Sequence, residues 1–120
     1  MEQGNVQTTE KDCTGHAETT LLRKASHIYE KDFLWDCTVY TSCEPCCMCV
    51  GAAYWANLGR IVYATTEAEL LAETGNNDEN PTFDSDCRSI LERGQKDIVV
   101  KGPVKELQKE AFAIHVGFWN

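Results

Sequence analysis

Hydrophobic residues recur at helical spacing in the first part of the chain. Their intervals of four, four and three residues place them on one face of a helix. These residues are Ala17, Leu21, Ala25 and Ile28. We therefore expect a helix from about His16 to Tyr29, capped by Thr14, after a polar stretch from Met1 to Asp12.

The middle of the chain is patterned as strand, helix, strand. After a connection over Lys31–Asp36, a short strand is expected over Cys37–Thr41 and another over Arg60–Ala64. The helix between them, Cys46–Asn57, has Pro45 in its first turn and Gly59 beyond its end. Because it is apolar on nearly every side, we expect it to be buried all round. A βαβ unit of this length predicts two parallel strands.

The second half carries shorter patterns and no internal repeat, so one domain over residues 1–120 is expected. The predicted elements are a helix over Glu67–Thr74, a turn-rich loop over Gly75–Ser85, a helix from an Asp86 cap through Glu92, a strand over Asp97–Lys101, and a helix from Val104 to Ile114 that Gly117 stops.

The charge balance and the apolar content indicate which class of substrate and which compartment to expect. The 11 Lys and Arg against 19 Asp and Glu give a net charge of -8, and the basic residues are scattered. Proteins that grip nucleic acid usually gather positive charge, so the balance favours a small substrate over tRNA or DNA. No stretch approaches the roughly 20 apolar residues of a membrane span, and no signal peptide opens the sequence. We expect a cytoplasmic protein.

The residues with catalytic or metal-binding side chains lie mainly in two motifs. Their cysteines are consistent with a reducing, cytoplasmic compartment. Seven Cys in a reducing environment more often bind metal than form disulfides. His16-Ala17-Glu18 is followed by Pro45-Cys46-Cys47-Met48-Cys49, which is the H-x-E…P-C-x-x-C signature of zinc deaminases. Cys46 and Cys49 lie on one face of a helix start, where the dipole favours thiolates. Three protein ligands leave a fourth zinc position for water, and Glu18 can exchange protons with that water.

Simpler interpretations of the same residues stay open. A Cys-x-x-Cys pair alone is also typical of a structural zinc site or a redox pair. Cys43 and Cys47 are additional thiols that could replace a ligand, although small buried side chains are the ordinary role. Cys13, Cys37 and Cys87 have no partner spacing and receive no role.

The motif regions resemble a known family. TGHAE over 14–18 and YTSCEPCCMCVGAAYW over 40–55 are similar to the cytidine deaminase superfamily, and most similar to the bacterial-type guanine deaminases. The resemblance implies a three-layer α/β/α fold around a mixed sheet and hydrolytic loss of ammonia from a nucleobase or nucleoside, guanine first. It also implies that His16, Cys46 and Cys49 hold Zn²⁺ and that Glu18 moves protons.

The resemblance also suggests substrate contacts and an assembly. Asn5 falls where the family has an Asn that hydrogen-bonds the base, and Phe118 and Trp119 could close the pocket, sometimes from a swapped subunit; a turn residue and ordinary packing are the alternatives. Relatives carry a helix and a β-hairpin before that Asn, so an N-terminally shortened fold of about three strands is expected. A homodimer is expected as in relatives. A non-catalytic zinc-stabilised remnant or partner subunit and a tRNA adenosine deaminase remain competing functions.

Overall fold

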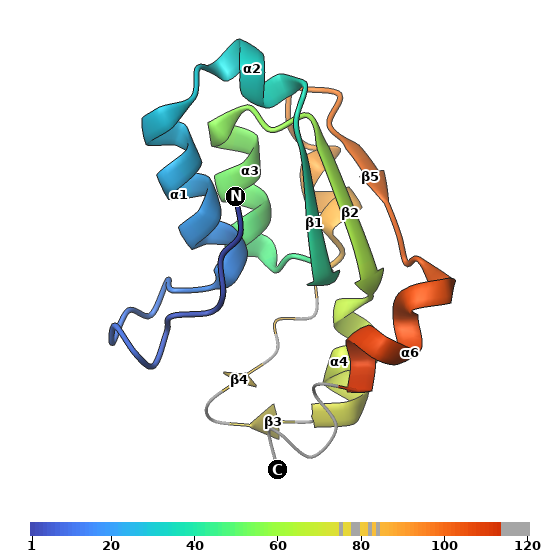
Figure 1. The fold of residues 1–120 in the computed structure, drawn as a ribbon. Coiled ribbons are helices and arrows are strands. Elements are labelled where there is room, and N and C mark those ends of the chain that lie inside the picture. The colour runs from blue at the N-terminus through green and yellow to red at the C-terminus, as the bar shows by residue number, and fades with distance from the viewer. Residues whose placement is uncertain (75, 78–79, 82, 84, 114–120) are drawn as a thin grey trace.

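The computed structural model describes residues 1–74, 76–77, 80–81, 83 and 85–113, and it alternates helices with strands (Figure 1). The elements are α1 (Ala17–Ile28), α2 (Lys31–Trp35), β1 (Thr38–Cys43), α3 (Cys47–Ala56), β2 (Arg60–Thr65), α4 (Glu67–Thr74), β3 (Asn76–Asn77), β4 (Asn80–Pro81), α5 (Cys87–Leu91), β5 (Val99–Lys101) and α6 (Lys105–Ala113).

A three-stranded sheet lies at the centre of the fold. Its order is β1-β2-β5, and both pairings are parallel. Helices α1 and α3 lie on one side of the sheet and α6 crosses its other side (Figure 1). The α/β architecture, the βαβ unit and the three strands are therefore confirmed. The strands β3 and β4 form a separate antiparallel pair of two residues each.

The core lies between the sheet and α1, α3 and α5. Val50 and Cys87 are fully buried, and Ile61, the second residue of β2, is 1% exposed. The core cluster comprises Leu22, Val39, Val50, Ala53, Ala56, Leu58, Ile61, Tyr63, Cys87 and Leu91. Burial of these apolar side chains holds α3 against the sheet, and α3 carries both candidate cysteine ligands at its start.

Helix α1 differs from its prediction in its cap and in its buried face. Its N-cap is His16, whereas the Thr14 hydroxyl donates to Asp12 Oδ1 at 2.7 Å. Leu22 is buried, but Ile28 is 63% exposed. Packing against α3 sets this rotation of α1. The rotation directs the first turn of α1 toward Cys49.

Helix α3 is also not buried all round, because Trp55 is 75% exposed. It ends at Asn57, which adopts the left-handed conformation (φ 69°), so Gly59 is not its stop. Gly59 serves a close approach instead: a Cβ there would lie 1.8 Å from the Trp35 carbonyl oxygen. The segment before β1, expected as a connection, contains α2.

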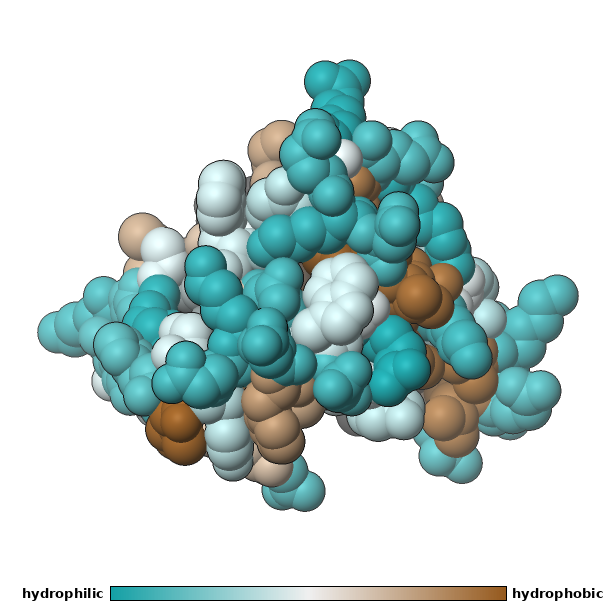
Figure 2. Space-filling model, turned by 90° about the horizontal axis from the view of Figure 1, so that it is seen from above, coloured by the Kyte–Doolittle hydropathy of each residue, from teal (hydrophilic) through white to brown (hydrophobic). Residues whose placement is uncertain are grey.

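Apolar side chains reach the surface at the end of the molecule that carries α2. Figure 2, which views that end, shows pale and brown atoms among hydrophilic ones. Phe33 is 53% and Trp35 37% exposed there, and the rings of Tyr29 and Phe33 stack at 4.9 Å. Within the described parts of the chain, no helix is long and apolar enough to cross a membrane.

Candidate functional site

The predicted metal ligands meet where two neighbouring helices begin. His16 is the N-cap of α1 and Cys46 is the N-cap of α3, each in an extended conformation. Cys49 lies in the first turn of α3 and is 1% exposed. Because the unpaired N–H groups of helix starts carry partial positive charge, this position favours thiolates. The βαβ unit and the α1–α3 packing together bring residues 30 and more positions apart into one cluster.

The three side chains have the spacing that a zinc ion requires. His16 Nδ1 lies 3.4 Å from Cys46 Sγ and 3.7 Å from Cys49 Sγ, and the two sulfurs are 3.6 Å apart. A tetrahedral zinc with ordinary bond lengths would need S–S separations of about 3.8 Å and S–N separations of about 3.5 Å. In the described residues this group has three members and no fourth Cys or His. The cluster therefore fits Zn²⁺ with one position left for a small molecule.

The two thiols differ in proton affinity. Contact with Cys49 lowers the pKa of Cys46 to about 4, helped by the His16 ring and by the backbone N–H of Cys49. The same contact, together with burial, raises the pKa of Cys49. The pKa of His16 is raised, first by its hydrogen bond with Cys46. One thiolate is thus available at neutral pH before any metal arrives, and metal ligation would release the proton that the sulfurs share.

Glu18 lies beside this cluster with its two oxygens in different surroundings. Oε2 is 3.4 Å from Cys49 Sγ, on the side of the ligands. Oε1 accepts a hydrogen bond from the Thr41 hydroxyl at 2.5 Å. Glu18 is half-buried in the first turn of α1. The carboxylate can therefore reach a molecule bound at the open metal position without being a ligand itself.

A second carboxylate, Glu44, stands between β1 and the Pro45-Cys46 start of α3, and sequence reasoning missed it. It is 5% exposed. Its Oε1 accepts from the Glu67 backbone N–H and its Oε2 from the Cys87 backbone N–H, each at 3.0 Å. These are the first residues of α4 and α5, so one side chain caps two helices. Glu44, Asp86 and Cys87 also cluster as possible metal ligands, but the capping bonds already occupy both Glu44 oxygens.

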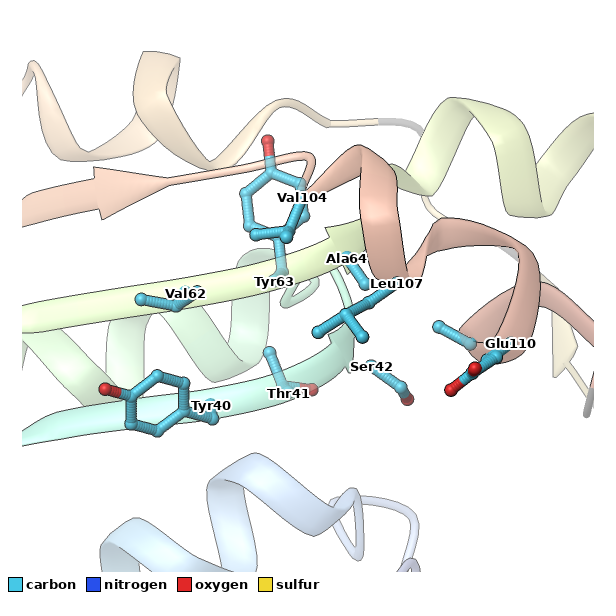
Figure 3. Close-up of a pocket in the computed structure, with 10 residues that line it drawn as sticks. Tyr40, Thr41, Ser42, Val62, Tyr63, Ala64, Val104, Leu107 and Glu110 are labelled. Atoms are coloured by element: carbon cyan, nitrogen blue, oxygen red, sulfur yellow. The ribbon is translucent and has the colours of Figure 1, made fainter.

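Two cavities border β1, and only one of them reaches Glu18. The smaller, about 270 Å³, is lined by residues that include Gln3, Glu18, Leu21 and Thr41. The larger, about 410 Å³, lies between the outer face of the sheet and α6. Figure 3 shows Tyr40, Val62 and Leu107 around it. Neither lining includes His16, Cys46 or Cys49, but the smaller one includes Glu18, so the smaller cavity is the one that borders the predicted proton-transfer group.

The remaining predicted residues are placed as follows. Asn5 is exposed, and its Oδ1 accepts from the Gln7 backbone N–H at 2.9 Å, which is a local turn. It does not line either cavity, and its contact with a base stays a prediction. Phe118 and Trp119 lie outside the described residues, as does Gly117. Cys43 and Cys47 are partly buried and are not members of the ligand cluster.

Comparison with known proteins agrees with this geometry. The model of the cytidine and deoxycytidylate deaminase zinc-binding region matches residues 1–65. A probable cytosine deaminase of Schizosaccharomyces pombe is 36% identical over the whole chain, which covers 71% of that protein. A guanine deaminase of Bacillus subtilis is 49% identical over 76 residues, which are 63% of this chain and 47% of that one.

A solved structure extends the likeness to the fold. Guanine deaminase from Nitrosomonas europaea superposes with a TM-score of 0.71 at 26% identity, over 94% of this chain and 61% of that chain. The chain thus spans about half the length of the Bacillus enzyme and three fifths of the Nitrosomonas one. Residues 1–65, which match the family model, contain His16, Glu18, Cys46 and Cys49.

Proposed function

This chain belongs to the cytidine and deoxycytidylate deaminase zinc-binding family, and on that premise we propose that it is a zinc-dependent hydrolase that deaminates a nucleobase or nucleoside, with guanine favoured. The observation that carries the proposal is the convergence of His16, Cys46 and Cys49, with separations of 3.4 to 3.7 Å, beside the Glu18 carboxylate. A purely structural zinc site has no need of an adjacent free carboxylate.

The proposed roles follow from where each group lies. When bound, zinc would supply Lewis-acid activation of water. Glu18 Oε2, on the ligand side, would take a proton from the attacking water and pass it to the departing amino group. The new C–O bond replaces the C–N bond, and ammonia leaves with the proton that Glu18 delivers. His16, Cys46 and Cys49 would hold the ion, and α3 would hold the cysteines.

The preference for guanine rests on likeness, and the preference for a small substrate rests on shape. Identity to the Bacillus guanine deaminase is 49% over 76 residues, identity to the probable cytosine deaminase is 36% over 123 residues, and the solved structure with a TM-score of 0.71 is a guanine deaminase. The cavity beside Glu18, about 270 Å³, lies near the lower limit of small-ligand sites. A free base fits such a site more readily than a bulky substrate such as tRNA.

The test is ammonia release by zinc-loaded protein from guanine, guanosine, cytosine and adenosine. We expect turnover of guanine with the largest kcat/KM of the four. Turnover of cytosine alone would replace the substrate and keep the reaction class. Folded protein with one bound zinc and no turnover of any of the four would contradict the proposal and favour a non-catalytic zinc-stabilised subunit.

A further inference from the structure

The two oxygens of Glu18 are not equivalent, and the difference is set by β1. Side chains alternate between the two faces of a strand. Val39 is buried on the helix side of the sheet and Tyr40 is 78% exposed on the other side, so Thr41 and Cys43 point to the helix side as Val39 does. Thr41 thereby faces the first turn of α1. Its hydroxyl donates to Glu18 Oε1, which leaves Oε2 toward Cys49.

A glutamate at a helix start needs such a partner to stay in one orientation. Its side chain has three rotatable bonds, and fixing a side chain of this kind costs conformational entropy. Within the described residues this carboxylate accepts two hydrogen bonds, from the Thr41 hydroxyl to Oε1 and, more weakly, from the Cys49 thiol to Oε2 at 3.4 Å. A hydroxyl on a strand is well suited to the task, because a β-branched side chain has few rotamers and β2 holds β1 in register, with Thr41 opposite Tyr63.

We infer that Thr41 is a positioning residue that orients Glu18, so that Oε1 stays bound to the Thr41 hydroxyl and Oε2 stays directed at the ligand cluster for proton transfer. The inference rests on the proposed function for its catalytic meaning. It predicts that loss of the hydroxyl impairs the chemical step rather than the binding of substrate or metal. Thr41 also lines the cavity that contains Glu18, so substrate and carboxylate share one wall.

The test compares three variants of the zinc-loaded protein. Thr41→Val keeps the shape and β-branching and removes the donor. Thr41→Ser restores the donor. Thr38→Val is the matched control, because it removes a hydroxyl from the same strand that bonds only Arg60 Nε, at 3.1 Å. We expect kcat of Thr41→Val to fall roughly 10- to 100-fold with KM, zinc content and Tm near wild type, since misplacing a catalytic group by about 1 Å can cost on the order of 100-fold. Thr41→Ser should recover most of the rate and Thr38→Val should keep it.

Three results would overturn the inference, and the crystallographic one does not depend on activity. A kcat of Thr41→Val equal to that of Thr38→Val would overturn it, and so would a loss of zinc or a lowered Tm that accounts for the whole effect. Crystal structures of wild type and Thr41→Val should show the Glu18 carboxylate turned in the variant; an unchanged carboxylate would also overturn it. If wild type turns over none of the four compounds, the proposed function fails, and the crystallographic comparison alone decides the role of Thr41.

Discussion

Glu18 and Glu44 each lie two residues from a predicted metal ligand, His16 and Cys46 respectively, yet the protein treats them in opposite ways. Glu44 is 5% exposed and both its oxygens accept backbone N–H groups, from Glu67 and Cys87. Glu18 is half-buried, and only one of its oxygens is held by a hydroxyl, that of Thr41. Both oxygens of Glu44 are used to cap helices, whereas Glu18 directs one oxygen, 3.4 Å from Cys49 Sγ, at the ligands.

The difference shows how a fold assigns roles to identical groups. A buried carboxylate is tolerated when each oxygen receives charge-assisted hydrogen bonds, and two helix starts supply such donors to Glu44. A carboxylate that must exchange protons needs one uncommitted oxygen and access to solvent or substrate. Substitutions that alter one property at a time can test this division.

The largest effect is expected for Glu18→Gln. The amide keeps the shape but cannot accept and return a proton, so kcat should fall by roughly 10² to 10⁴. Zinc content and Tm should stay near wild type, because Glu18 is not a ligand. Assays of ammonia release with metal analysis on the same samples measure both. Full activity in this variant would remove Glu18 from the proposed mechanism.

Glu44→Gln should act on stability instead. The amide offers one acceptor and places an NH₂ group against a backbone donor, so one buried N–H loses its partner. Since a hydrogen bond to a charged group contributes about 1.5–3 kcal/mol, we expect a loss of roughly 2–4 kcal/mol in the free energy of unfolding, measured by urea titration. Glu106→Gln, at an exposed position of α6, is the control and should change little. Equal values for the two variants would mean that Glu44 does not support the fold.

Asp86→Ala tests whether burial decides the strength of a cap. Asp86 is exposed and accepts from the Arg88 backbone N–H at 3.2 Å at the same helix start that Glu44 reaches. Loss of an N-cap of this kind costs about 1 kcal/mol, less than expected at Glu44. Asp86→Asn should retain most of the stability, because Asn is an equally good cap. A loss at Asp86 as large as that at Glu44 would argue that burial is not the deciding factor.

The smallest effect concerns Glu67, whose side chain is 7% exposed. Burial, and then the negative charges of Cys46 and Glu44, raise its pKa from 4.5 to about 7. Because the folded state holds this proton more tightly than the unfolded state, stability is full below about pH 4.5 and declines as the pH rises to about 7. In zinc-free protein, Glu67→Gln should match wild type at pH 4.5 and melt at a higher temperature at pH 8. The same difference in melting temperature between Glu67→Gln and wild type at both pH values would contradict the raised pKa of Glu67.

Local patterns in the sequence predicted the elements that hold the ligands. Pro45 marks the start of α3, and the strands on either side of it lie near their expected positions, because these signals act over a few residues. The predicted ligand set and the predicted role of Glu18 follow from the spacing of residues within the two motifs, which can be read directly from the sequence. Helix α2 was missed since five residues are too few to show a helical period.

Features that depend on partners distant in sequence could not be predicted. The side of α1 that is buried is set by its packing on α3, and the exposure of Trp55 depends on which faces of α3 other elements cover. In the sequence, Glu44 is simply the residue before Pro45 in the cysteine motif. Only the folded chain shows that its side chain contacts residues 23 and 43 positions away. Thr41 and Glu18 are likewise joined only when β1 lies beside α1.

The two hydrogen bonds that Glu44 accepts have a consequence for engineering. The chain leaves this carboxylate at Glu67 and returns to it at Cys87, so the two attachment points stay fixed whatever number of residues joins them. A library that varies the length or content of the segment after Thr74 would leave the zinc-binding half of the molecule undisturbed.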